Sequence, residues 1–421
     1  MRFAAVCLGL TALSVAGAAS AEVDLISPRT VQGTITVGGA TSDGPTSWTH
    51  GGFGKAAFGR GTFGTADADV VWQPQFTDSL SLVVDGVAQR GVRPSVDVAE
   101  AYVLWRPLPT SATRVQARLG MLYVPVSLEH DSTPGEPWGV RDTLTPSAIN
   151  SWVGEEVKVL AAEGTVERTF TSLNLQATLA AFSHNDTAGT LIALRGWSFS
   201  DVVATASGRM TVPPRSDYAD PQSPQTQPFR RLDDRLGVYG RVRLSHARGT
   251  VDLTAYDNNA ELGAGQGGQW GWRTRFYNLG VTLPLGPTTT VSGQALDGHT
   301  DALVGGPGGY RYNLDFRSAY LRLTEHRGSE TLTGRVDLCE TRSKHLSPGD
   351  LFYHPGPPDL DETYSENGWA GLGAWRHALA PGRAVTLEWL HVTWKRAYMA
   401  AFETAPHQHT DTLRAAYQLS F

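Results

Sequence analysis

The connections between the strand-like runs of this 421-residue chain are of two kinds, short and long, which alternate along the whole sequence. Sixteen runs combine a two-residue alternation of apolar and hydrophilic side chains with β-branched and aromatic residues, the pattern of strands. The runs lie at 30–38, 64–73, 79–89, 97–106, 113–123, 155–163, 170–182, 235–246, 249–257, 272–284, 288–297, 315–325, 330–341, 368–378, 383–395 and 411–421.

The short connections are turn-like, and several contain Gly or Pro. They are QPQFTDS, PLPTSA, AEGTVER, HAR, LGPTT, HRG and HALAPG. The long connections are 39–63, 90–96, 124–154, 183–234, 258–271, 298–314, 342–367 and 396–410. An even number of strands with short turns on one side and long loops on the other is typical of outer-membrane barrels. We therefore predict an all-β fold, a transmembrane antiparallel β-barrel of about sixteen strands.

The last strand-like run has two distinct faces. Leu413, Ala415, Tyr417, Leu419 and Phe421 share one face, and hydrophilic residues dominate the other. A soluble β-sandwich would also alternate, but it has no reason to sort its loops by length. In a barrel the apolar face meets lipid and closure satisfies every backbone hydrogen bond. A sixteen-stranded lumen is too wide for side chains alone to fill, so we expect it to hold water.

Two points of the strand plan stay open. The connection 183–234 contains LIALRGWSFSDVVATA, whose composition would suit a further strand pair, so eighteen strands is the alternative. Whether this connection enters the lumen is not predicted. Aromatic residues near strand ends suggest a girdle at the membrane interface. They are Trp72, Trp105, Tyr123, Trp272, Trp369, Trp375 and Trp394.

The first residues have the features of a secretory signal. Arg2 precedes an apolar run from Phe3 to Val15, and small residues end in Ala19-Ser20-Ala21. We predict a signal peptide at 1–21 and a barrel domain at 22–421. Removal of Arg2 leaves 34 basic residues against 41 acidic ones, a net charge of −7, which gives no support to nucleic-acid binding. Cys339 is the only cysteine after the signal, so an intramolecular disulfide is not expected.

Two stretches resemble known outer-membrane proteins. The terminal TLRAAYQLSF, with Tyr417, Leu419 and the final Phe421, resembles the signal that the barrel-assembly machinery recognises. RLGMLYVPVSLEHDS, followed by LTPSAINSWVGEEV at 144–157, resembles the porins grouped with the phosphate-selective O and P porins. The resemblance implies that the third long connection, 124–154, folds into the lumen and narrows it. It also implies a homotrimer in a Gram-negative outer membrane, in contact with lipid and lipopolysaccharide.

The predicted constriction combines basic strands with an acidic loop. The candidates on strands are Arg118, Lys158, Arg241, Arg243, Arg322 and Arg335, and those in the loop are Glu129, Asp131, Glu136 and Arg141. A basic wall facing an acidic loop would create a transverse field that filters solutes by charge. The alternative is that these arginines pair with inward acids such as Glu100, Asp252, Asp337 and Glu388 and hold the wall together. The loop has one Arg and no Lys, which argues against phosphate selectivity.

No catalytic motif appears in a usable context, and no enzyme activity, cofactor or metal is predicted. His407 and His409, and the histidines and acids of 342–367, lack the spacing of a zinc or calcium site. We expect a porin that lets small hydrophilic solutes or ions diffuse passively through a water-filled lumen. The alternatives are a channel specific for phosphate or another anion, a channel for oligosaccharides, and a secreted β-sandwich that binds carbohydrate.

Overall fold

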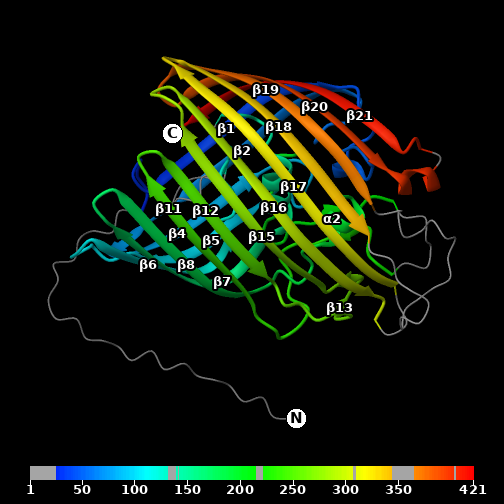
Figure 1. Ribbon diagram of the computed structural model, residues 1–421, viewed down its shortest axis with the longest axis horizontal. Coiled ribbons are helices and arrows are strands. Elements are labelled where there is room, and N and C mark those ends of the chain that lie inside the picture. The colour runs from blue at the N-terminus through cyan, green and yellow to red at the C-terminus, as the bar shows by residue number, and fades with distance from the viewer. Residues whose placement is uncertain are drawn as a thin grey trace, which may run out of the picture.

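The computed structural model describes residues 25–130, 139–140, 142–214, 221–306, 310–343, 365–402 and 404–421. Sixteen long antiparallel strands form one sheet that closes on itself (Figure 1). They are β1 (Val31–Ser42), β2 (Gly61–Trp72), β4 (Leu80–Ala88), β5 (Val96–Trp105), β6 (Thr113–Tyr123), β7 (Lys158–Thr169), β8 (Leu173–Ser183), β11 (Gly237–His246), β12 (Gly249–Asp257), β15 (Trp272–Pro284), β16 (Thr289–Val304), β17 (Tyr310–Arg327), β18 (Glu330–Ser343), β19 (Glu366–Ala380), β20 (Arg383–Arg396) and β21 (His407–Ser420).

Closure is made by the first and last strands. β1 pairs with β2 on one side and with β21 on the other, from Thr34 opposite Ser420 to Ser42 opposite Thr412. The predicted all-β barrel of sixteen strands is confirmed, and the β-sandwich alternative is wrong. The eighteen-strand alternative is also wrong: in the described part of 183–234 the only strands are β9 (Met210–Thr211) and β10 (Gln225–Thr226), which pair with each other away from the barrel sheet.

The wall of the barrel is lower on one side than on the other. The strands from β1 to β12 contain 9 to 12 residues, whereas those from β15 to β21 contain 13 to 18. About 9–11 residues of tilted strand cross a hydrocarbon layer, so the longer strands project beyond it. The chain enters β1 and leaves β21 on the side of the barrel that carries the short turns, as predicted.

The exterior is apolar around the barrel. Large hydrophobic side chains point outward on successive strands, among them Leu119, Leu179, Leu253, Leu321, Leu338 and Leu413. Tyr417 and Phe421 are exposed on this face, as the alternation of the last strand predicted. Part of the predicted aromatic girdle is correct, since Trp105 and Trp369 are exposed. Tyr123, Trp272 and Trp394 are buried, and for these three the prediction is wrong.

The strands β15 to β17 reverse their apolar face along their length. In the half near the short turns, Leu279 and Leu323 face outward. Near the long loops the outward positions carry charges such as Asp297, which pairs with Arg317. Several inward positions there are apolar: Trp272, Ala302, Val304 and Leu314 pack against Ala193. The prediction of a loop at 298–314 is wrong for this reason, because strand β16 continues to Val304 and β17 begins at Tyr310.

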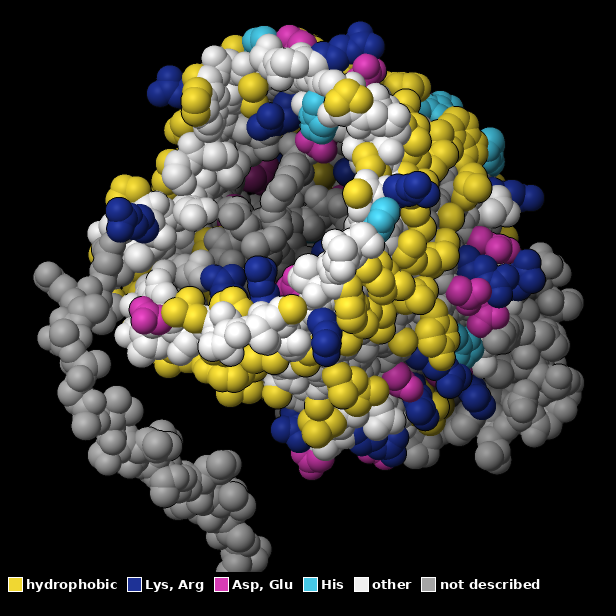
Figure 2. Space-filling view, turned by 60° about the vertical axis from the view of Figure 1, so that its left-hand side comes forward, with side chains coloured by type: hydrophobic (Ala, Val, Ile, Leu, Met, Phe, Trp, Pro, Cys, Tyr) yellow, Lys and Arg dark blue, Asp and Glu magenta, His cyan; other side chains and the backbone are white. Residues whose placement is uncertain are grey.

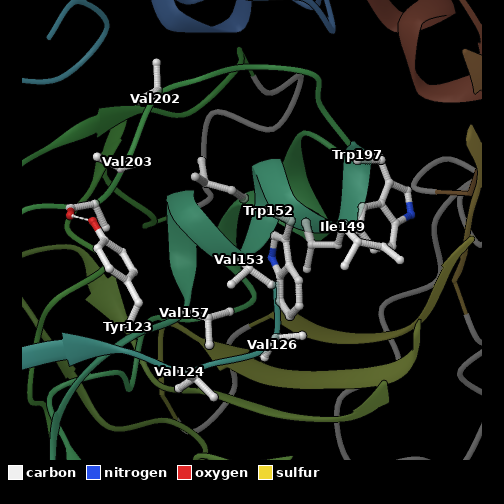
Figure 3. Close-up of a cluster of buried hydrophobic side chains, with 14 of the residues drawn as sticks. Tyr123, Val124, Val126, Ile149, Trp152, Val153, Val157, Trp197, Val202 and Val203 are labelled. Atoms are coloured by element: carbon white, nitrogen blue, oxygen red, sulfur yellow. Dashed lines mark hydrogen bonds between the residues drawn. The ribbon is translucent and has the colours of Figure 1, made fainter. Parts of the chain in front are cut away.

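Two long connections enter the barrel and fill part of it. Loop L3 (124–157) contains helix α1 (Ala148–Glu156), and loop L4 (184–236) contains the short helix α2 (Thr190–Leu194). Their buried side chains form one large cluster with the inner wall, in which Trp152, Trp197 and Phe316 take part. Figure 3 shows these apolar side chains gathered around α1 from several segments. The described residues contain no helix of the length and apolarity needed to cross a membrane.

Candidate functional site

Loop L3 is attached to the wall by buried charges. Arg335 on β18 donates to Asp337 (2.8 Å) and to Glu129 of L3 (3.0 Å), and its two terminal nitrogens also reach the carbonyl oxygens of Thr145 and Pro146, each at 2.9 Å. Arg335, Asp337 and Glu129 have fully buried side chains. The planar guanidinium group of Arg335 thus binds two carboxylates and two backbone carbonyls at the same time.

The start of α1 is held by hydrogen bonds to the backbone N–H groups that have no partner within the helix. The Ser147 hydroxyl accepts from the backbone N–H of Asn150, and Asp337 accepts from the N–H of Ala148 at 3.1 Å. Acceptors at these positions satisfy donors that an isolated helix leaves unpaired. The structure therefore starts a helix where the sequence predicted a loop, and continues it to Glu156. The strand predicted at 155–163 begins instead at Lys158.

A second attachment, from strands β20 and β21, holds the adjoining residues of L3. Glu388 on β20 accepts from the N–H groups of Leu144 (2.6 Å) and Thr145 (3.1 Å). Arg414 on β21 donates to the Leu144 carbonyl at 2.9 Å and to Asp201 of L4 at 2.7 Å. L3 and L4 are therefore tied to the same strand wall, and to each other through it.

Helix α1 also carries the contact with L4. Glu155 accepts from the hydroxyls of Ser198 (2.9 Å) and Ser200 (2.8 Å), and Arg195 lies 2.6 Å from the same carboxylate. The Glu156 carboxylate accepts from the backbone N–H of Leu191 at 2.7 Å, and also from the N–H of Ile192 and the Trp152 indole. L3 and L4 thus form one packed unit inside the barrel, which we call the internal unit.

Burial shifts the pKa values of several groups in the internal unit. Burial alone would raise the pKa of Glu129, but Arg335 and Arg322 outweigh it and lower the pKa to about 2. Burial lowers the pKa of His130 to about 4, so this histidine is neutral at neutral pH. Burial raises the pKa of Glu156 to about 7, because only neutral N–H donors touch its carboxylate and the charge of Arg195 acts from farther away.

Glu156 should make the internal unit more stable in acid than in base. Its pKa rises from an ordinary value of 4.5 to about 7, so its contribution is fully present below about pH 4.5 and is lost as the pH rises through 7. We expect the thermal midpoint of the wild type relative to Glu156→Gln to be higher at pH 5 than at pH 8, and scanning calorimetry in detergent measures it. The control is Glu340→Gln, which replaces a partly exposed carboxylate that pairs with Arg342. Equal pH dependence in wild type and Glu156→Gln would contradict the assignment.

A cavity of about 520 Å³ remains between the internal unit and one part of the wall. Strands β19, β21, β1, β2 and β4 line it on one side, and residues of L3 and L4 on the other. Its charged and titratable side chains are Asp67, Asp69, His130, Asp142, Asp201, Arg376 and Arg414. Figure 2 shows the end of the barrel hollowed, with basic and acidic side chains around the opening. The cavity is the candidate passage.

The structure pairs several of the predicted pore residues with acids. Arg118 on β6 donates to Glu163 at 2.6 and 2.7 Å, and Tyr239 donates to the same carboxylate at 2.6 Å. Arg241 and Arg243 both bind Asp252. All three arginines point into the barrel, as the two-residue alternation predicted. Their positive charge is matched locally, so these contacts follow the alternative in which arginines hold the wall together.

The remaining predicted residues are distributed as follows. Lys158 is fully buried, with its ammonium 4.3 Å from the centre of the Tyr123 ring. Arg322 lies 3.8 Å from Glu129 and donates to Ser292. Asp131, Glu136 and Arg141 lie outside the described residues. Among the described loop residues, Glu129 is not free to face solutes, because Arg335 holds it. Whether any of these residues line a pore remains a prediction.

The candidate passage depends on residues that were not singled out from the sequence. Asp67 and Asp69 lie on the same, inward face of β2 as Val71, and Arg414 lies on the inward face of β21. The two-residue alternation of the sequence therefore indicates that these three charged side chains point into the barrel. Asp201 lies in a loop without periodicity and carries no such signal. Among the residues that the structure describes, no group of three or more His, Cys, Asp or Glu side chains could hold a metal ion.

No protein-family model matches the sequence, and no curated protein matches it. Solved structures do resemble the fold. The outer membrane channel DcaP of Acinetobacter baumannii is 7% identical, with a TM-score of 0.53 over 93% of this chain and 96% of that one. An anion-selective porin from Comamonas acidovorans is 10% identical, with a TM-score of 0.50 over 93% of this chain and 99% of that one.

The fold is a closed β-barrel of the kind that the compared outer-membrane channel and porin adopt. A closed sheet with an apolar exterior and charged interior is the form in which strands satisfy their backbone groups within a bilayer. Both compared structures are covered almost completely, so the likeness concerns the whole barrel. The narrower resemblance to the phosphate-selective O and P porins is not supported by these comparisons and stays a prediction.

Proposed function

We propose that this protein is an outer-membrane porin through which small hydrophilic solutes or ions diffuse passively. The observation that carries the proposal is the closed barrel that is apolar outside and encloses a charged cavity of about 520 Å³ beside its internal loops. Such a cavity offers polar solutes a path that avoids hydrocarbon. No cofactor or catalytic step is needed for this function.

Selection of solutes in this porin is by size first. The internal unit occupies the part of the lumen where Trp152, Phe276 and Phe316 pack, so solutes pass only along the side of β21, β1, β2 and β4. A passage confined to one side of the barrel is narrower than the empty lumen of a sixteen-stranded barrel. Charged side chains along this side then act on ions at close range, where water screens them least.

A planar lipid bilayer tests the proposal directly. Refolded protein added to one side in 1 M KCl should insert and produce stepwise increases in current, because each barrel adds one ion path. On unheated gels the barrel should migrate differently from the heated protein, since a closed sheet resists detergent until it is heated. The heated, unfolded protein is the control. Folded protein that inserts but carries no current would overturn the proposed function.

Several further assignments follow from this function. The signal peptide at 1–21 lies in the part of the chain that the structure does not describe. An outer-membrane protein is exported by means of such a signal peptide and lies in contact with lipid and lipopolysaccharide. The barrel-assembly machinery would recognise this one at Tyr417, Leu419 and Phe421. We include a homotrimer in the proposal, and the low wall from β1 to β12 is the side on which neighbouring barrels would pack. A slow-migrating band on unheated gels would reveal it.

Specific transport of phosphate is not the function we favour. The comparison porin from Comamonas acidovorans is anion-selective, but this chain uses Arg118, Arg241 and Arg335 to neutralise inward acids. A phosphate site needs several cationic donors that remain available to the ligand. We therefore propose a general passage rather than a phosphate channel.

A further inference from the structure

We propose that the passage prefers small cations to anions and that Asp69 and Asp142 set this preference. The inference rests on the proposed porin function and deepens it by naming the class of solute. It follows from the side chains that line the cavity between the internal unit and the strands β19, β21, β1, β2 and β4. The argument depends on which of these charges are already compensated by a neighbour.

Two acids and two arginines beside the cavity compensate one another. Arg90, in the connection between β4 and β5, donates to Asp67 at 2.6 Å and to Asp201 at 2.7 and 2.8 Å. Arg414 donates to Asp201 at 2.7 Å. The four groups form one chain of ion pairs with two positive and two negative charges. These linked ion pairs contribute little net field to an ion in the cavity.

The remaining lining charges are mostly negative. Neither Asp69 nor Asp142 forms an ion pair with any Lys or Arg in the described part of the chain. The side chain of Asp69 is hydrogen-bonded instead to Asp85 on the neighbouring strand β4. Such a bond requires one of the two acids to hold a proton, so the pair carries one negative charge. On the basic side, Arg376 is the one lining residue left over among the residues that the structure describes, since His130 is neutral.

The positions of these charges favour a cation. Asp69 on β2 and Asp85 on β4 lie on adjacent strands, whereas Arg376 is on β19, on the other side of β20, β21 and β1. An ion that follows β2 therefore passes the one negative charge of the Asp69–Asp85 pair, whereas the guanidinium lies across the cavity. One unit charge about 8 Å from a solvated ion changes its local concentration about twofold, in opposite directions for K⁺ and Cl⁻.

Reversal potentials test the preference. Single channels are recorded across a tenfold KCl gradient, with wild type, the double variant Asp69→Asn/Asp85→Asn, Asp142→Asn and Arg376→Gln. We expect the wild type to pass K⁺ at least about twofold better than Cl⁻. The double variant and Asp142→Asn should each move the ratio toward Cl⁻, because each removes one negative charge without changing the size of a side chain. Arg376→Gln should move the ratio toward K⁺.

Asp297→Asn is the matched control, since Asp297 points out of the barrel and pairs with Arg317. It should leave the ratio unchanged. Wild-type channels that conduct but prefer Cl⁻, or a double variant with the wild-type ratio, would overturn the cation preference and leave the porin function standing. Folded protein that carries no current would overturn the porin function, and the cation preference with it.

Discussion

Replacing Arg335 with alanine is expected to free L3 from the wall and to make the channel noisy and wider. The change leaves Asp337 buried without its cation and Glu129 with only the more distant Arg322, and removal of one partner from a buried pair costs about 3–5 kcal/mol. The carbonyls of Thr145 and Pro146 lose their donor as well. Single-channel recording should show larger and fluctuating conductance, and the thermal midpoint of the folded barrel should fall.

Two variants separate this effect from a general loss of stability. Arg327→Ala removes an exposed arginine that pairs with Glu325, and such a pair contributes about 0–1 kcal/mol. It should behave as wild type. Adding Glu129→Gln and Asp337→Asn to Arg335→Ala removes the uncompensated charges and should recover part of the thermal midpoint. An Arg335→Ala channel with quiet, wild-type conductance would show that L3 does not depend on this attachment.

Replacing Trp152 with alanine is expected to loosen the internal unit while the barrel stays closed. Trp152 is fully buried, with its ring centre 5.0 Å from that of Phe316 and 5.3 Å from that of Phe276. Loss of such a side chain costs about 3–5 kcal/mol. Its indole N–H also donates to Glu156 at 2.7 Å, so the contact between α1 and L4 weakens too. Conductance should rise, because more of the lumen becomes accessible.

The closed barrel should survive this change, since no ladder hydrogen bond involves the side chain of Trp152. The unheated protein should therefore keep its shifted gel mobility. Trp369→Ala is the control: this tryptophan is 44% exposed on the exterior, and its loss should leave conductance unchanged. Trp152→Phe should be milder than Trp152→Ala, because it retains a ring in the cluster. Equal conductance in Trp152→Ala and wild type would mean that the internal unit does not limit the passage.

Many features of the wall could be predicted because they are local. The side chain of every second strand residue points to the same face, so Arg118, Arg241 and Arg335 were placed inside from neighbouring residues alone. The same rule places Asp67, Asp69 and Arg414, which were not singled out although the pattern contained them. The rule placed the ends of β16 and β17 wrongly, because these ends extend beyond the membrane. There water favours polar residues on the outer face, and packing against L4 favours apolar residues on the inner face.

The sequence by itself determined the strand plan, the alternation of short and long connections, and the apolar exterior from β1 to β21. These follow from hydrophobic periodicity and turn chemistry, which act between residues close in the chain. Only the tertiary structure decided that L4 joins L3 inside the lumen, that Glu129 is held by Arg335, and that Asp69 keeps no cationic partner in the described chain. Those outcomes depend on contacts such as Glu129 with Arg335, 206 residues apart, and no local pattern specifies which distant charges meet.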